Sequence, residues 1–366
     1  MSNSVWNWHI VTPEYPPQIG GVGDYSRLVA EEFAARGEAV SVWYPGCDAL
    51  PQGFSPEGLR ALSRYLDAGA RPRRIFVQWV PHGYGYRSMN VAFAFWLWRR
   101  AHSGDQIDLM VHEPFLPFRE GSWKQDGAAV VHRAMILLAL RAATHVWVSI
   151  PRWRPQLEKW QWGNRIPIEW LPVPSNVVPT GETDFSLRER FPADRPLIGH
   201  FGTYGKQILG VLEHQLPVLL EAGVNILLLG RDSDLVAASF NNRRILGLGT
   251  QDGPALSRSL AACDLLLQPY TDGISARRGS AMAAIAHGKA LVTTRGPATE
   301  SIWQRSQAVC LVPHDDLDAL PQAVLGMIED RGRLRQLGAR ARTLYEENFS
   351  VRLTVQRLLN RKGAAC

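Results

Sequence analysis

The sequence is poor in the features that mark disulfide scaffolds, metal sites and membrane spans. Its 366 residues include four cysteines, and none of them has metal-ligand or CxxC spacing. We expect reduced thiols of a cytosolic protein at all four positions, Cys47, Cys263, Cys310 and Cys366. The longest apolar runs, AMILLAL and VAFAFWLW, are far shorter than the roughly 20 residues that a spanning helix needs.

The amino-terminal segment also lacks the marks of export. MSNSVWNWHIVTP has neither the basic region nor the long apolar region of a signal peptide. We therefore predict a cytoplasmic protein that is soluble or, at most, bound peripherally at the inner face of a membrane. The net charge of +6 suits a diphosphate-bearing substrate or an anionic membrane surface. Nucleic acid is the weakest candidate partner, because no zinc-finger, RNA-recognition or basic-helix pattern is present.

The first half of the chain reads as alternating strands and helices. A short apolar strand at 8–11 precedes a Pro- and Gly-rich loop, a helical pattern ending at Gly37, and a second strand at 40–43. Such a βαβ unit requires a parallel sheet. Further strands are predicted at 74–79, 107–111 and 144–148, with helices near 90–103 and 128–142.

The second half repeats this pattern after a Pro-rich connector at 171–180. Strands are predicted at 196–202, 225–229, 244–248, 265–268 and 290–294, and helices near 207–222, 253–262, 277–287, 316–329, 331–346 and 349–361. We therefore predict an α/β protein with an N-terminal Rossmann-like domain over 1–180, a C-terminal one over 181–347, and a closing helix over 348–366. Because ligands of open parallel sheets bind beyond the carboxyl ends of the strands, we expect the site in a cleft between the two domains.

Two loops of the first half carry candidate ligand groups. Gly20, Gly21 and Gly23 stand between the first strand and the first helix, where backbone amides can approach a phosphate. The same glycines could simply form a tight turn. His112 and Glu113 follow a strand end, where they can contact a substrate hydroxyl, and His112 could exchange a proton near neutral pH. The alternative is that His112 only caps a loop.

Two loops of the second half suit an anionic donor. One runs from Asp272 through Gly273, Ile274 and Ser275 to Arg277, Arg278 and Ser280. Its aspartate can accept hydrogen bonds from sugar hydroxyls, its amides can hold a phosphate, and one arginine can neutralise a diphosphate leaving group. The other loop contains Gly202, Thr203 and Lys206. Solvated arginines on a capped surface helix, and a solvent-exposed lysine, are the alternatives.

These sites, in this order, resemble the family 4 glycosyltransferases of the GT-B fold. The resemblance covers nearly the whole chain and rests on TPEYPPQIGGVGDYS, VHEP, CDLLLQPY with the acidic residue and glycine that follow it, HGKALVTT with Glu300, and FSVRLTVQRLL. It implies a nucleoside-diphosphate-sugar donor, retention of anomeric configuration, no obligatory metal or cofactor, and a role in polysaccharide biosynthesis. It also places His112 beside the transferred sugar and returns the closing helix to the first domain.

The sequence departs from the family pattern at two points. Asp272 stands for the first of two glutamates spaced eight residues apart, and Ser280 stands where the second would contact the ribose. Thr203 occupies the position of a usual arginine, so Lys206 remains and Arg277 or Arg278 would supply the missing charge. The resulting hypothesis makes His112, Asp272, Lys206 and Arg277 catalytic, and assigns the donor to Gly20, Gly21, Gly23, Gly202, Thr203, Gly273, Ile274, Ser275, Arg278 and Ser280.

The acceptor is expected on the first domain and would be a glycan, a lipid-linked glycan or a small molecule. Its candidate contacts are Glu113 and three residues of the loop after the strand at 74–79, namely His82, Tyr84 and Arg87. Aromatic and basic residues at 93–100 and 152–162 could touch an anionic bilayer, or could equally form a buried amphipathic face.

Other functions stay open at this stage. A nucleotide-sugar epimerase would share the fold, and a catalytically silent nucleotide-sugar or glycan-binding protein would explain Thr203 and Ser280. A plain Rossmann oxidoreductase is disfavoured, because the GxGxxG fingerprint is missing from both halves.

Overall fold

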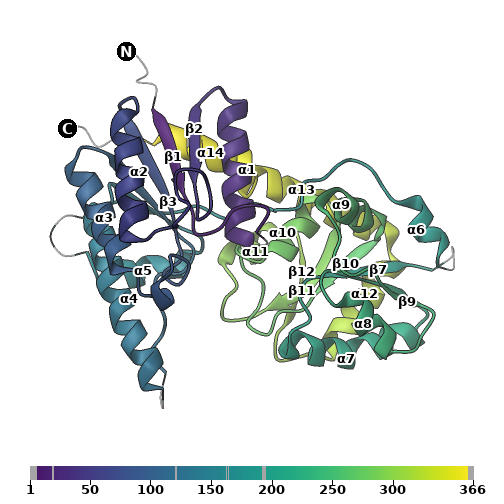
Figure 1. Ribbon diagram of the computed structural model, residues 1–366. Helices are drawn as coiled ribbons and strands as arrows, with labels where there is room; N and C mark the ends of the chain where they lie inside the picture. Colours follow the sequence, from purple (N-terminus) through teal and green to yellow (C-terminus); the bar gives the residue numbers. More distant parts are fainter. Residues whose placement is uncertain are drawn as a thin grey trace. The chain divides into compact units, whose positions relative to one another are not determined.

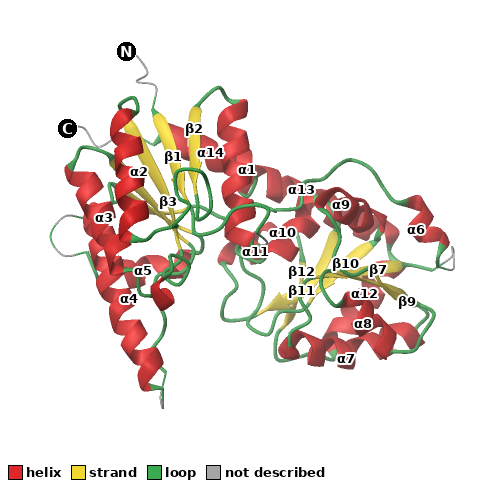
Figure 2. Cartoon of the chain, in the orientation of Figure 1, coloured by secondary structure: helices red, strands yellow, loops and turns green. Residues whose placement is uncertain are grey.

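The computed structural model describes residues 6–18, 20–119, 122–161, 163, 165–191 and 195–361. The chain divides into two compact units (Figure 1). Unit 1 contains Met1–Val173 and Thr354–Cys366, and unit 2 contains Pro174–Leu353. Each unit has one six-stranded sheet flanked by helices (Figure 2).

The sheet of unit 1 is entirely parallel, in the order β2-β1-β3-β4-β5-β6. Its strands are β1 (Asn7–Val11), β2 (Ala39–Trp43), β3 (Arg73–Trp79), β4 (Gln106–Val111), β5 (His145–Val148) and β6 (Ile168–Trp170). Its helices are α1 (Gly21–Ala35), α2 (Pro56–Ala68), η1 (Tyr86–Ser88), α3 (Val91–His102), α4 (Trp123–Ala142), η2 (Pro151–Trp153) and α5 (Arg154–Glu158). The central strands are buried along nearly their whole length, because helices cover both faces.

Local sequence fixes where the helices of unit 1 begin. Ser55 caps α2 by accepting the amide of Gly58 at 3.1 Å. Asn90 caps α3 in the same way, and its side-chain nitrogen also donates to the carbonyls of Tyr84 and Phe54. α3 therefore starts at a fixed point relative to the loop that follows β3.

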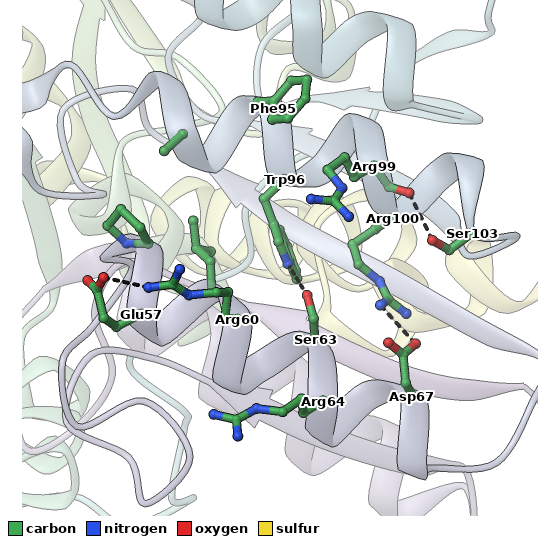
Figure 3. A pocket seen from close by; sticks show the side chains of 13 residues that line it. Glu57, Arg60, Ser63, Arg64, Asp67, Phe95, Trp96, Arg99, Arg100 and Ser103 are labelled. Atoms are coloured by element: carbon green, nitrogen blue, oxygen red, sulfur yellow. Dashed lines mark hydrogen bonds and ion pairs between the residues drawn. The ribbon is translucent and has the colours of Figure 1, made fainter.

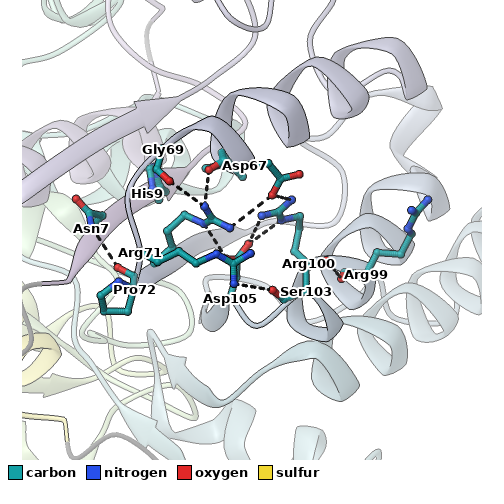
Figure 4. Close-up of polar contacts among 12 residues, drawn as sticks. Asn7, His9, Asp67, Gly69, Arg71, Pro72, Arg99, Arg100, Ser103 and Asp105 are labelled. Carbon is teal, nitrogen blue, oxygen red and sulfur yellow. Dashed lines mark hydrogen bonds and ion pairs between the residues drawn. The ribbon is translucent and has the colours of Figure 1, made fainter.

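The carboxyl end of α3 is joined to the carboxyl end of α2 by buried charges. Arg73 and Arg100 both bind Asp105, and Arg100 also reaches Asp67 at 2.9 Å (Figure 4). The side chains of Arg73, Arg100 and Asp105 are almost completely buried. The network ties β3 to the two helices at the amino end of the sheet, opposite to the edge where ligands bind.

The last helix, α14 (Val351–Asn360), crosses the unit boundary and packs on unit 1. Beyond its end, the guanidinium of Arg361 pairs with the fully buried carboxylate of Asp108 and donates to Thr144 Oγ1 at 2.9 Å. Arg74 donates to the carbonyl of Leu358 at 3.4 Å and lies over the ring of Trp8. Burial lowers the pKa of Arg361 to about 9. The expected closing helix ended at residue 366, and residues 362–366 lie outside the described part of the chain.

The Arg361–Asp108 pair predicts a specific stability defect. Arg361→Ala leaves a buried carboxylate without its partner, which should lower the free energy of unfolding by about 3–5 kcal/mol. Gln356→Ala, at an exposed position of the same helix, is the matched control and should change it by less than about 0.5 kcal/mol. Urea titration measures both values. Equal stabilities of the two variants would show that the pair does not anchor the end of the chain.

The sheet of unit 2 is also parallel, in the order β12-β11-β10-β7-β8-β9. Its strands are β7 (Leu197–Phe201), β8 (Asn225–Leu229), β9 (Ile245–Gly247), β10 (Leu265–Gln268), β11 (Ala290–Arg295) and β12 (Cys310–Pro313). Its helices are α6 (Phe185–Glu189), α7 (Lys206–Glu221), α8 (Ser233–Ser239), α9 (Gly253–Ala262), α10 (Gly279–Ala286), α11 (Ser301–Ser306), α12 (Ala319–Glu329) and α13 (Arg331–Asn348).

The prediction of two Rossmann-like α/β halves is confirmed. α2, β6 and β12 were not foreseen, and α4 begins at Trp123 rather than near residue 128.

Among the described residues, no helix is both long enough and apolar enough to cross a bilayer. Cys47, Cys263 and Cys310 are free thiols, and Cys366 lies outside the described residues.

Candidate functional site

The Gly-rich turn of unit 1 is occupied by a carboxylate of the same chain. Glu14 Oε1 accepts the backbone amides of Val22 at 2.9 Å and Gly23 at 3.1 Å, at the amino end of α1. A Cβ atom on Gly20 would lie 2.1 Å from that oxygen, so a larger residue there would displace the carboxylate of Glu14 from its present position. Gly21 has open space around it. The turn thus has the anion-binding geometry expected from the sequence, and Glu14 fills it.

Removing this carboxylate should loosen the turn. Glu14→Ala leaves two amides of α1 without an acceptor, and we expect the free energy of unfolding to fall by about 1–2 kcal/mol. Glu14→Gln retains a carbonyl oxygen that can accept both amides, so it should recover most of the loss. Urea unfolding of the two variants tests this, and equal losses in both would contradict the capping role.

His112 lies at the carboxyl end of β4 and is held in one orientation. Its Nε2 lies 2.9 Å from Oε1 of the buried Gln78 at the end of β3, and its ring meets the edge of Tyr25 at 5.4 Å between centroids. The backbone carbonyl of His112 accepts the indole N–H of Trp153 at 3.1 Å. Burial lowers the pKa of His112 to about 4. At pH 7 the ring is therefore neutral, which suits a hydrogen bond to a ligand better than the proton exchange anticipated from the sequence.

The acceptor candidates of unit 1 are in very different environments. His82 and Glu113 are about half exposed and face each other at 3.6 Å between Nδ1 and Oε2. Arg87 is exposed in the left-handed turn η1. Tyr84 was expected to contact the acceptor, but it is not accessible to one. Its ring is 2% exposed and stacks on Phe93, and its hydroxyl donates to the carbonyl of Gln78. It belongs to the core because the Gly-rich loop folds inward at this position.

The stretch 93–100 also belongs mainly to the core, although it was considered for membrane contact. Phe93, Trp96 and Leu97 are buried, and Arg100 is part of the charge network described above. The exposed edge of this helix lines a groove of about 720 Å³ between α2 and α3 (Figure 3). Within it, the indole of Trp96 donates to Ser63 at 2.8 Å and Arg60 pairs with Glu57. The buried amphipathic alternative is therefore the one that the structure favours.

In unit 2, the loop after β10 leaves few groups free for a ligand. The amides of Gly273 and Ile274 donate to the carbonyls of Tyr270 and Thr294. Gly273 has φ +89°, and a Cβ atom there would lie 2.3 Å from the amide nitrogen of Gly296. Among residues 273–276 only Ser275 retains an amide without a partner in the described structure, and its buried hydroxyl is unpaired as well.

A second carboxylate completes this loop. Glu300 accepts the amide of Ala276 at 3.0 Å and the indole N–H of Trp303 at 2.8 Å. Burial raises the pKa of Glu300, and the contact with Ala276 opposes that shift. Glu300 matched the family pattern in the sequence, but its role in holding the loop could not be read there.

The two arginines of this loop take different positions. Arg278 pairs with Asp272 and lies over the ring of Tyr270 at 4.8 Å, so it turns back towards β10. Arg277 is exposed. The hydroxyl of Ser280 lies 2.7 Å from that of Tyr270, which places a neutral pair where the family pattern has a carboxylate. Asp272 therefore holds a cation as well as being open to a sugar hydroxyl.

The loop after β7 brings together a helix start, a cation and a buried histidine. Lys206 opens α7 and is exposed, as is Thr203, and neither makes a side-chain hydrogen bond or ion pair to the described residues. Gly202 approaches β8 closely, because a Cβ atom on Gly230 would lie 2.2 Å from its carbonyl oxygen. His200 Nδ1 donates to the carbonyl of Leu267 at 2.9 Å, and its buried Nε2 has no partner among the described residues.

Two further basic residues at this edge were missed. Arg231 follows the end of β8, and Arg295 is the last residue of β11; both are exposed. The strands β11, β10, β7 and β8 are neighbours and parallel, so their carboxyl ends share one edge. A basic residue at a strand end was the available signal in the sequence. The edge thus gathers cations suited to an anionic ligand.

Two pairs of aspartates also follow strands of unit 2. Asp232 and Asp234 follow β8 in Asp-x-Asp spacing, as do Asp316 and Asp318 after β12. Nevertheless, the described ranges contain no group of three or more histidine, cysteine, aspartate or glutamate side chains placed to hold a metal ion.

The buried histidine of β7 predicts a pH dependence. Burial lowers the pKa of His200 to about 4, against 6.5 for an ordinary histidine. Below pH 6.5 His200 becomes protonated in the unfolded chain, whereas in the folded protein it stays neutral down to about pH 4. The free energy of unfolding therefore falls as the pH falls through this window. His200→Asn retains a donor towards Leu267 but no titrating ring. Between pH 7.5 and 5, urea unfolding should show a loss smaller by about 2 kcal/mol in this variant. An unchanged loss would refute the buried neutral ring.

The comparisons with known proteins agree with this geometry. Residues 195–330 match the family model described as glycosyl transferases group 1. The matched segment lies within unit 2. The match covers less than half of the chain, and no curated protein matches the sequence.

Solved structures extend the likeness to both units. Sucrose-phosphate synthase from Thermosynechococcus elongatus has a TM-score of 0.68 at 17% identity, over 96% of this chain and 97% of that one. Anabaena HepE in complex with UDP and glucose has 0.63 at 15% identity, over 96% and 97%. A putative UDP-N-acetylglucosamine 2-epimerase from Listeria monocytogenes has 0.58 at 11% identity, over 96% and 94%. The chain has the GT-B fold.

Proposed function

We propose that this protein is a glycosyltransferase that moves a hexosyl group from a nucleoside-diphosphate sugar to an acceptor hydroxyl, with retention of anomeric configuration. The group 1 match of residues 195–330 supports the activity, and the HepE complexes with UDP and UDP-glucose support the class of donor. The acceptor is a glycan, a lipid-linked glycan in particular, and would make its contacts on unit 1.

The observation that carries this proposal is the composition of the carboxyl edge of unit 2. Lys206 and Arg231 stand exposed after neighbouring strands, next to the start of α7. The helix start contributes a favourable field for an anion. Fixed cations stabilise the charge that develops on a departing diphosphate, the task that Mg²⁺ performs in other enzymes. A protein-held diphosphate therefore accounts for this edge without an obligatory metal.

The remaining groups suit the sugar and the nucleoside. Ser275 offers an unpaired hydroxyl and a free amide, so it can bind a sugar or phosphate oxygen. His112 is neutral and donates from Nε2 to Gln78, so it would accept one hydrogen bond on Nδ1 at the transferred sugar. The hydroxyls of Ser280 and Tyr270 would take the place of a ribose-binding carboxylate. A neutral pair at that position discriminates less strongly between a ribose and a deoxyribose than a carboxylate does.

One alternative has specific support, the likeness to a putative epimerase. An epimerase changes a free nucleotide sugar without an acceptor, so NMR of the donor incubated with the protein alone separates the two activities. A nucleotide-sugar-binding protein without catalysis would show neither conversion nor transfer.

Donor binding is the first test. A thermal-shift screen of UDP-, GDP-, ADP- and TDP-sugars should reveal one class that raises the melting temperature. A donor present at 100 times its dissociation constant stabilises the folded state by about 2.7 kcal/mol. If no nucleotide sugar shifts the transition, the proposed function is wrong.

Single substitutions then test the cations. Lys206→Ala and Arg277→Ala should each lower kcat by about 100-fold or more, because each would remove charge from the leaving group. Arg278→Ala should act partly through Asp272, which it releases from an ion pair. Arg335→Ala, at an exposed position on α13, is the matched control and should retain wild-type turnover. Wild-type rates in all three test variants would remove the assignment of the diphosphate site.

A further inference from the structure

The outward face of α4 is apolar from Trp123 to Ala134. Trp123, Gly127, Val130 and Ala134 are all exposed and recur at intervals of four, three and four residues, which places them on one side of the helix. Trp123 is 79% exposed and Val130 57%. The opposite face, which includes Met135 and Ile136, is buried against unit 1. Figure 1 shows the amino-terminal end of α4 reaching beyond the other elements of this unit.

Buried contacts of α4 hold two neighbouring loops in place. His132, on the inner face of α4, donates from Nε2 to the carbonyl of Ser88 at 2.7 Å and accepts the amide of Leu116 on Nδ1 at 3.3 Å. The first bond fixes the turn that exposes Tyr86, and the second fixes the segment that exposes Phe118. We call the exposed side chains of Phe118, Trp123 and Val130 the α4 patch.

Basic side chains lie beside the α4 patch. Lys124 Nζ lies 5.6 Å from the ring centroid of Trp123, and the guanidinium of Arg133 lies 4.0 Å from that of Phe118. Between residues 116 and 142 the sequence has four basic residues and two acidic ones, listed as Arg119, Lys124, Arg133 and Arg141 against Glu120 and Asp126. Asp126 is already engaged by the amide of Arg119 at 2.8 Å. The segment that carries the patch therefore has a positive charge balance.

We propose that the α4 patch docks on the surface of an anionic lipid bilayer. A tryptophan and a phenylalanine beside lysine and arginine suit the boundary between headgroups and acyl chains, where the rings enter and the cations remain with lipid phosphates. The positive charge balance of this segment matches the negative charge of such a surface. A helix of 20 residues is about 30 Å long and can lie in that plane. The inference deepens the proposed function, because it places unit 1 where a lipid-linked acceptor would be found.

This site differs from the segments considered from the sequence alone. Phe93, Trp96 and Leu97 are buried, so they cannot enter a bilayer without unfolding α3. The α4 patch was not recognised because the hydrophobic stripe of its helix resembles that of any core helix. Only the burial of the opposite face shows that this stripe is the one left outside.

Vesicle co-sedimentation of the full chain provides the test. Vesicles made of equal parts of phosphatidylglycerol and phosphatidylcholine should bind the protein, and vesicles of phosphatidylcholine alone should bind it much less. Trp123→Ser combined with Val130→Ser should weaken binding about tenfold or more. Lys124→Glu should weaken it at least fivefold at low salt, because each basic residue near such a surface contributes about that factor. Phe185→Ser is the matched control, since Phe185 is a 73% exposed aromatic residue of unit 2, and it should bind as the wild type does.

The outcomes separate this inference from the proposed function. Equal vesicle binding by the double variant and the wild type would overturn the α4 patch as a membrane surface. So would light scattering that shows a dimer which the double variant dissociates, because the patch would then be covered by a second copy. All of these variants should retain the thermal shift with the nucleotide sugar, since none lies on unit 2 near the donor edge. Loss of that shift in every protein, including the wild type, would concern only the proposed function.

Discussion

Both sheets are wholly parallel, and this constraint places the functional groups of the chain. Every strand of a parallel sheet must be followed by a crossover that returns the chain to the starting edge, so all the loops that leave carboxyl ends gather at one edge. In unit 2 these loops come from β11, β10, β7 and β8, which are adjacent. Lys206, Asp272 and Arg231 are far apart in the sequence and share an edge for this reason alone.

The same constraint requires helices on both faces of each sheet, and the two faces of unit 1 are closed in different ways. Apolar packing of α2, α3 and α4 covers one face, from Ile75 and Val77 on β3 to Ile136 on α4. On the other face, Phe33 of α1 packs on Trp8, and α14 returns from unit 2 and is held by charge. A buried ion pair gives little net stability but permits only one register. Arg361 and Asp108 therefore determine where the chain returns more than how strongly it is held.

The sequence was sufficient to predict the fold class, because the periodicity of apolar residues and the alternation of strands and helices along the chain are local signals. Apolar runs such as those of β3 and β10 could be assigned as strands, because helical segments separate them. α2 was missed because its polar residues dominate, with only Leu59, Leu62 and Leu66 facing the core. β6 and β12 were missed because each is short and lies at a sheet edge. Length and edge position weaken the apolar signal on which such predictions depend.

The site was predicted less completely. A sequence motif shows where the backbone amides of a loop lie, but it does not show which side chains of the same protein already accept hydrogen bonds from them. Glycine at positions 20 and 23 predicted an anion at the start of α1, and the anion in the structure is Glu14. The loop after β10 repeats this arrangement with Glu300, which lies outside the motif that it completes.

In both units an internal carboxylate therefore decides which groups are left for a ligand. Where the amides are satisfied internally, a phosphate gains little by approaching them. The groups that remain unsatisfied carry more information than the glycines do. At the carboxyl edge of the unit 2 sheet these include the hydroxyl and amide of Ser275, the Nε2 of Gln268 and the Nε2 of His200. Because leaving buried polar groups unpaired costs stability, a water molecule or a polar ligand that paired with these groups beside Lys206 would recover that cost.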